Sequence, residues 1–90
     1  MNRDELVKTL QEIITKDPYV AFFIEFFADF GIEPLIGNTV KNPKTNTKIT
    51  ASPVLNKIII EQDGKRIAIP ISTAKQIVEE LYGRIPLQLI

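Results

Sequence analysis

The sequence predicts a small α+β domain in which a helical hairpin and a third, C-terminal helix pack on one face of a small antiparallel β-sheet. Apolar residues recur at helical spacing over the first thirty positions and again after position 70. Between them, an Asp-Gly pair joins two isoleucine-rich runs of equal length. The predicted order is ααββββα, with the first two strands the least well defined. We expect residues 1–90 to form one compact domain, in which 84–90 are a candidate docking tail.

The composition excludes several kinds of chemistry. The chain has neither cysteine nor histidine, so it lacks thiolates, disulfides, sulfur ligands for metals and the usual general base. Its start is polar and charged, unlike a secretion signal, and charges interrupt every apolar run before the roughly 20 residues of a membrane span. We therefore expect a cytoplasmic protein without a membrane segment. Fifteen isoleucines, and eight lysines against three arginines, are typical of a thermophile or of an AT-rich genome.

The first predicted helix has a clear start. Asn2 and Glu5 have the spacing of a capping box, in which each residue satisfies a free N–H group of the other. Apolar residues then repeat at intervals of three and four, and polar residues fill the other side. The pattern predicts a helix from about Arg3 to Thr15.

The second predicted helix follows at once and carries most of the aromatic residues. Asp17 is placed to act as its N-cap, Pro18 as its first residue and Gly31 as the residue after its C-terminus. Six of the seven aromatic residues of the chain share one side of it: Tyr19, Phe22, Phe23, Phe26, Phe27 and Phe30. We expect this stripe to anchor the hydrophobic core, because each buried ring removes about 150–250 Å² from water.

Four strands are predicted between the second and third helices. Asp63-Gly64 supplies the positive φ angles of a type I′ turn between Lys57–Gln62 and Lys65–Pro70. The resulting register places four isoleucines on one face, which must contact the helices: Ile58, Ile60, Ile67 and Ile69. The preceding segment, 38–52, is rich in Asn, Thr and Lys and predicts only an irregular or weakly paired hairpin.

A third helix is predicted after the sheet. Ser72 or Thr73 is expected to cap it, with Thr73 and Gln76 as a second capping box, and Gly83 is expected to end it. Its apolar stripe is expected to face the core and consists of Ala74, Ile77, Val78, Leu81 and Tyr82.

Catalytic or metal-binding chemistry is not expected. The nearest candidate is the pair Glu25 and Asp29, four residues apart on the second helix, but acidic residues on the flank of an apolar helix usually serve solubility. The glycines do not have the spacing of a phosphate-binding loop. We predict that the protein is not an enzyme and needs no cofactor, metal or small-molecule substrate.

A lysine-rich region, residues 41–66, raises the hypothesis of nucleic-acid binding. The candidates are Lys41, Lys44, Lys48, Lys57, Lys65 and Arg66. The first 37 residues, by contrast, carry seven acidic residues against three basic ones. The region lacks aromatic residues for base stacking and has one arginine, so only nonspecific phosphate contacts are expected. The alternative is that these lysines only keep a loop solvated.

Protein binding is the function that the sequence favours. The aromatic side of the second helix is wider than the other elements can cover, so part of it is a candidate interface: Tyr19, Phe22, Phe23, Phe26 and Phe30. The tail is a second candidate, because Ile85, Leu87 and Leu89 alternate as in a strand that adds to a sheet edge. For both surfaces, burial within the chain's own fold is the alternative.

The predicted function is a noncatalytic interaction module or accessory subunit that docks a larger protein or self-associates. The alternative is a small DNA-associated protein, such as a replication or transcription accessory factor, that contacts phosphates through its lysine-rich region. The two hypotheses are compatible, because the acidic and basic halves of the chain suit different partners.

Overall fold

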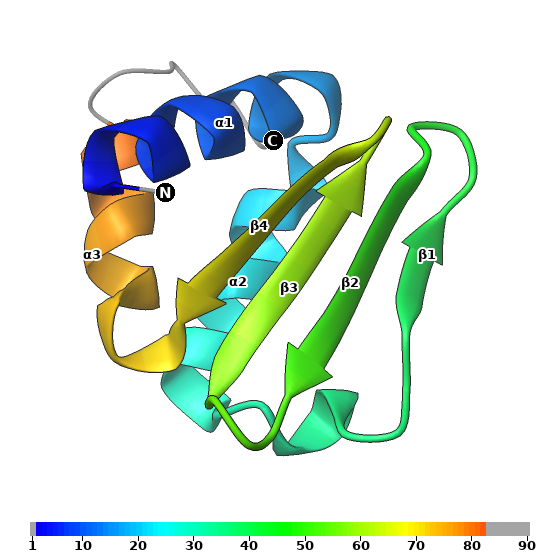
Figure 1. Cartoon of the computed structure of the whole chain (residues 1–90), viewed down its shortest axis with the longest axis vertical. Helices are drawn as coiled ribbons and strands as arrows, with labels where there is room; N and C mark the ends of the chain where they lie inside the picture. Colours follow the sequence, from blue (N-terminus) through cyan, green and yellow to red (C-terminus); the bar gives the residue numbers. More distant parts are fainter. Residues whose placement is uncertain (1, 83–90) are drawn as a thin grey trace.

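The computed structural model describes residues 2–82 and confirms the predicted α+β architecture (Figure 1). Three helices lie on one side of a four-stranded antiparallel sheet: α1 (Arg3–Lys16), α2 (Tyr19–Phe30) and α3 (Ile71–Tyr82). The strands are neighbours in chain order: β1 (Val40–Asn42), β2 (Thr47–Ser52), β3 (Lys57–Gln62) and β4 (Lys65–Pro70). A short 3₁₀ helix, η1 (Glu33–Leu35), connects α2 to the sheet and was not predicted. Within residues 2–82, no helix is both long and apolar enough to cross a bilayer.

The β3–β4 hairpin has the predicted turn and register. Asp63 has a φ of 49° and Gly64 a φ of 84°, which are the positive angles that a type I′ turn requires. Across the hairpin, isoleucine stands opposite isoleucine on the side that faces the helices. All four of these side chains are at most 2% exposed: Ile58, Ile60, Ile67 and Ile69. The local turn signal therefore determines which face of the hairpin enters the core.

The Asn- and Thr-rich segment forms a more regular hairpin than the sequence predicts. β2 pairs with β3 along its whole length, while β1 pairs with β2 over three residues. The prediction of weak pairing was wrong for β2, because Thr47 and Ile49 face inwards and are buried together with the isoleucines of β3. β2 is thereby held by core packing as well as by its hydrogen bonds.

The core is aliphatic, which corrects the prediction that the aromatic stripe anchors it. Among the six aromatic residues of α2, only Phe27 is buried, and Phe23 is half-buried. The buried face of α2 consists of Val20, Ala21, Ile24 and Phe27. Because successive residues of a helix are about 100° apart, the centre of this buried face is rotated about the axis of α2 by roughly a third of a turn from the centre of the aromatic stripe. Small and aliphatic side chains allow α2 to pack closely against α3, whose buried residues are Ala74, Ile77, Val78 and Leu81.

The bounds of α1 agree with the prediction to within one residue, whereas α2 and α3 start elsewhere than predicted. α2 begins at Tyr19, with Pro18 and not Asp17 at its N-cap. The side chain of Asn2 accepts the N–H of Glu5 at 2.8 Å, which caps α1. The predicted cap of α3 was wrong, because this helix begins at Ile71, directly after β4, and Thr73 lies in its first turn. The Thr73 hydroxyl instead donates to the carbonyl oxygen of Pro70 at 3.2 Å. The predicted end at Gly83 lies outside the described residues.

An exposed ion pair ties the β3–β4 turn to the end of α1. Lys16 pairs with the Asp63 carboxylate, and the side-chain amide of Asn46 donates to its other oxygen at 3.1 Å. These hydrogen bonds, that of Lys16 foremost, hold the pKa of Asp63 below its usual value of 3.8. Because the pKa of Asp63 is lowered by folding, the ionised carboxylate stabilises the folded state slightly at neutral pH. This stabilisation is lost as the pH falls through the pKa of Asp63 in the folded protein.

The two faces of β3 make a direct test of this packing. Ile60→Ala should lower the free energy of unfolding by about 2–5 kcal/mol, because it opens a cavity in the fully buried core. Ile59→Ala, its neighbour on the half-buried outer face, should cost less than about half as much. Urea denaturation of both variants would measure the difference, and equal losses would contradict the assignment of the two faces.

Candidate functional site

Four large aromatic side chains of α2 are exposed on one side of the molecule. Their exposed fractions are 65% for Tyr19, 43% for Phe22, 46% for Phe26 and 69% for Phe30. The rings touch in pairs, with centroids 6.2 Å apart for Tyr19 and Phe22 and 4.9 Å apart for Phe26 and Phe30. From the area of such rings, this aromatic patch leaves on the order of 400 Å² in water. That is comparable with the largest apolar patch on a typical monomer, which is often functional.

An open apolar groove of about 600 Å³ runs beside the patch. One wall is formed by α2, and the other by η1 and the start of β1. The apolar residues that line this aromatic groove are Phe22, Phe23, Phe26, Phe27, Phe30, Pro34, Leu35 and Val40. Pro34 and Leu35 belong to η1, so the element that the sequence did not predict supplies the far wall.

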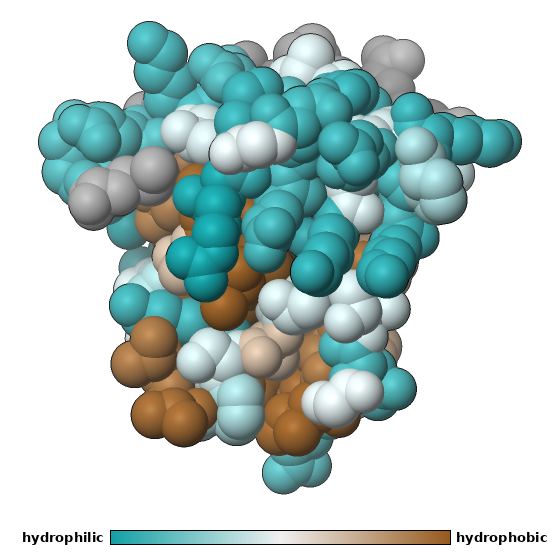
Figure 2. Space-filling model, turned by 45° about the vertical axis from the view of Figure 1, so that its right-hand side comes forward, coloured by the Kyte–Doolittle hydropathy of each residue, from teal (hydrophilic) through white to brown (hydrophobic). Residues whose placement is uncertain are grey.

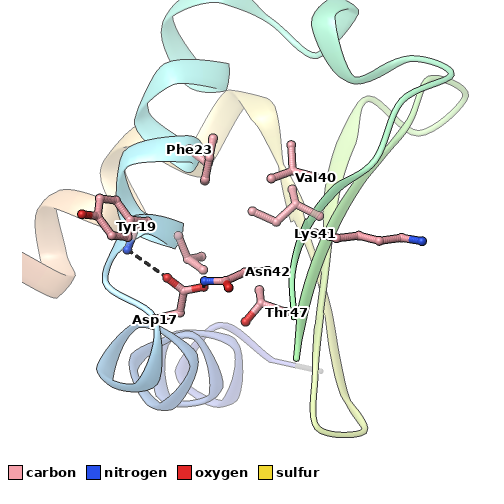
Figure 3. Close-up of a pocket in the computed structure, with 9 residues that line it drawn as sticks. Asp17, Tyr19, Phe23, Val40, Lys41, Asn42 and Thr47 are labelled. Atoms are coloured by element: carbon pink, nitrogen blue, oxygen red, sulfur yellow. Dashed lines mark hydrogen bonds between the residues drawn. The ribbon is translucent and has the colours of Figure 1, made fainter. Parts of the chain in front are cut away.

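A smaller cavity of about 260 Å³ lies towards the start of α2, between this helix and the sheet (Figure 3). It shares Phe23 and Val40 with the aromatic groove, so the two hollows adjoin. Figure 3 shows Phe23 and Val40 on opposite sides of the opening, whereas the Lys41 side chain extends away from it, beyond the far side of the strand. Successive residues of β1 thus point to opposite faces of the sheet.

The buried carboxylate of Asp17 holds β1 in place relative to α2. One of its oxygens accepts the backbone N–H of Tyr19 at 3.2 Å. The other accepts the side-chain amide of Asn42 at 3.1 Å and the hydroxyl of Thr45 at 2.8 Å. The sequence identified Asp17 only as a helix cap, because its partners lie 25 and 28 residues further along the chain.

The hydrogen bonds continue from Asp17 into the sheet. The hydroxyls of Thr45 and Thr47 lie 2.8 Å apart, and the side-chain amide of Gln62 donates to Thr47 at 3.0 Å. The same amide donates to the carbonyl oxygen of Ile13 at 3.2 Å. This polar network joins the end of α1, the β1–β2 turn and β3, and it closes one end of the smaller cavity.

The electrostatics of the aromatic groove are negative. Residues 17–40 contain four acidic residues and no lysine or arginine. Glu25 and Asp29 line the groove, and Asp29 also pairs with Lys75 at 3.5 Å. In the described part of the chain, no group of three or more acidic side chains could hold a metal ion. Glu25 and Asp29, which the sequence offered as the nearest candidates for catalysis, therefore lie at the rim of an apolar surface.

The predicted interface residues of α2 come together on this surface, although Phe23 lies deeper than the other four. The predicted tail residues Ile85, Leu87 and Leu89 lie outside the described residues. Sequence reasoning missed three exposed apolar side chains: Ile36, Val54 and Leu55. Figure 2 shows hydrophobic residues gathered in the lower half of one face of the molecule, while its upper half is almost entirely hydrophilic. Val54 and Leu55 lie between β2 and β3, in a segment for which no role was predicted.

The lysine candidates do not share one surface. The alternation along the strands places four of them on the outer face of the sheet: Lys41, Lys48, Lys57 and Arg66. Lys65 lies on the helix side, where it pairs with Glu12 at 3.6 Å, and Lys44 lies in the β1–β2 turn. The lysine-rich region therefore contributes a basic sheet face that is smaller than the sequence indicated.

The site offers contact surfaces, an apolar one on α2 and a basic one on the sheet. No protein-family model matches this chain, and no curated protein or solved structure is significantly similar to it.

Two neighbouring phenylalanines test which rings the fold needs. Phe27→Ala should cost about 3–5 kcal/mol of stability, because this ring is buried. Phe26→Ala should cost less than about 2 kcal/mol, because almost half of its surface is already in water. Thermal or urea unfolding would compare them, and a loss at Phe26 as large as that at Phe27 would show that the patch belongs to the core.

Substitutions of Asp17 test whether the polar network holds β1 in place. Asp17→Ala removes the acceptor of three donors and should lower the free energy of unfolding by about 2–4 kcal/mol. Asp17→Asn keeps the shape and one acceptor oxygen, so its loss should be smaller. Urea unfolding would measure both, and a stable Asp17→Ala variant would mean that β1 is held by other contacts.

Proposed function

We propose that this protein is a noncatalytic interaction module that docks a larger protein through the aromatic patch and groove of α2. The observation that carries the proposal is the exposure of Tyr19, Phe22, Phe26 and Phe30 beside an open apolar groove. Aromatic side chains are enriched at the centres of protein interfaces, where they contribute much of the binding free energy. A patch of this kind is the expected centre of such a contact.

The size of the patch supports this use. A stable interface buries about 800 Å² on each partner, and the exposed aromatic surface would supply roughly half of that. At about 25 cal/mol per Å², covering it gives a gross gain on the order of 10 kcal/mol, from which the costs of association are subtracted. The patch can therefore provide the apolar centre of an interface, and a polar rim would complete it.

The charge around the groove indicates the chemistry of the partner. Glu25 and Asp29 line the groove, and residues 17–40 contain no lysine or arginine, although Lys75 pairs with Asp29 at 3.5 Å. A symmetric dimer through the patch would place these carboxylates close to those of the second copy, where they would repel one another. A different protein, with apolar anchors flanked by lysine or arginine, complements the groove better. This favours the larger-protein prediction over self-association through α2.

Other parts of the predicted function remain proposals. The docking tail at 84–90 would add a second point of attachment, and a cytoplasmic location fits an accessory subunit. The proposal includes no catalytic role, and the lack of histidine and cysteine, which are frequent catalytic bases and nucleophiles, supports this part of it.

The proposal predicts that partner binding depends on the exposed rings. In capture from lysate of the source organism, Phe22→Ser/Phe26→Ser should lose a partner that the unmodified protein retains, because the centre of the contact is removed. Val54→Ser is the matched control, since Val54 is 91% exposed in the β2–β3 turn, outside the groove. It should retain the partner.

Two results would contradict the proposal. One is retention of every captured protein by Phe22→Ser/Phe26→Ser, with circular dichroism showing both variants folded. The other is a concentration-dependent dimer in sedimentation that the double variant abolishes, because the patch would then be a contact between copies of this chain.

A further inference from the structure

The face of the sheet turned away from the helices carries a group of cations. Alternation along the strands places Lys41, Lys48, Lys57 and Arg66 there, with Glu61 as the acidic residue among them. Figure 1 shows α2 behind the sheet, α1 above it and α3 beside it, so none of the three helices lies in front of this outer face. Among residues 2–82, no helix covers the outer face, which carries more positive than negative charge although the whole chain has a formal net charge of zero.

Strand register brings these charges into rows. Lys41 stands opposite Lys48, Lys48 opposite Glu61, and Glu61 opposite Arg66. Neighbouring strands lie about 4.8 Å apart, so one row crosses the sheet with three cations and one carboxylate. Lys57 lies on β3 four residues before Glu61, towards the other end of the face, and the half-buried Ile59 lies between them.

Most of these cations have no partner within the described part of the chain. Arg66 pairs loosely with Glu61 at 3.8 Å, but no carboxylate of residues 2–82 lies within 4.0 Å of the ammonium groups of Lys41, Lys48 or Lys57. Like charges directly opposite each other on a sheet are destabilising. The pairing of Lys41 with Lys48 therefore does not serve the stability of the fold, and an anion above the sheet would remove the repulsion.

The surroundings of this lysine pair suit an anion. Lys41 and Lys48 line a shallow hollow of about 260 Å³ beside the β1–β2 turn. Thr50 and Ser52 lie on the same outer face, further along β2, and their hydroxyls are hydrogen-bond donors. A phosphate group takes both kinds of contact, from ammonium groups and from hydroxyls.

We propose that the outer sheet face binds the phosphate backbone of double-stranded nucleic acid without reading its sequence. This site is separate from the aromatic groove and does not depend on the proposed protein docking. The cations are spread across four strands, which suits a long polyanion lying over the sheet and not a single small ion. The contacts are to phosphate, so the binding is nonspecific and sensitive to salt.

The uncharged residues of the outer face favour a nucleic-acid duplex over a single strand or a membrane surface as the ligand. Single strands are usually held by aromatic side chains that stack on the bases, and the outer face presents Ile59 and Ala68 at its centre instead. Membrane surfaces are bound by cations around protruding apolar residues, whereas Ile59 and Ala68 at the centre of this face are half-buried. The exposed Val54 and Leu55 lie only at its end, in the β2–β3 turn. A duplex needs neither feature, because its phosphates are already on the outside.

Fluorescence anisotropy with a labelled 20-base-pair DNA duplex, in 50 and 200 mM salt, tests the proposal. If all four cations contact phosphates, the affinity should fall by about 150-fold between these salt concentrations. Lys48→Gln should weaken binding at 50 mM salt and reduce the slope of log affinity against log salt by about 0.9, for the loss of one phosphate contact.

Lys65→Gln is the matched control, because it removes the same charge from the helix side of the same sheet. It should leave both the affinity and the salt slope almost unchanged. An equal effect of Lys65→Gln and Lys48→Gln would overturn the site, since binding would then follow net charge alone.

Three other results would also overturn the proposal. The first is the absence of binding to the duplex at 50 mM salt. The second is tighter binding to a single strand of the same length. The third is stronger binding to vesicles of phosphatidylserine and phosphatidylcholine that Lys48→Gln reduces, because the face would then recognise a lipid surface. Circular dichroism of each variant confirms that a change in binding is not a loss of fold.

Discussion

The structure depends on the burial of one isoleucine face of the sheet against the three helices. The Asp63-Gly64 turn places Ile58, Ile60, Ile67 and Ile69 on that face, where they are almost completely excluded from water. Because side chains alternate along a strand, the same register sends Glu61 and Arg66 to the outside. A slip of one residue would exchange the two sets. Core packing and the charge pattern of the outer face are therefore consequences of a single constraint.

α2 has a wider apolar surface than its neighbours can cover. The face formed by Val20, Ala21, Ile24 and Phe27 packs in the core, and this leaves four aromatic rings outside. The fold does not need these rings to be exposed, since polar residues at the same positions would serve a solvated helix equally well. Their exposure, together with the groove beside them, is the strongest sign that this surface contacts another molecule.

Local signals in the sequence predicted most of the fold. The capping of α1, the break at Pro18 and the Asp-Gly turn each depend on neighbouring residues, so they are visible without tertiary information. Periodicity showed that α2 is a helix, but it could not show which part of a broad apolar face the other elements cover. The partners of Asp17 are separated from it by more than 20 residues, and η1 has no pattern of its own. The aromatic residues of the site were therefore identified, while the groove beside them was not.

β1 connects the two candidate surfaces, although it is the shortest strand. Val40 faces the aromatic groove and Lys41 extends to the outer face, so adjacent residues of one strand serve different surfaces. The Asp17 network holds this strand in position from its buried side. Because the surfaces lie on different sides of β1, a protein on α2 and a duplex on the sheet would not compete for the same atoms. An accessory subunit built in this way would bring its protein partner to nucleic acid by binding both at once.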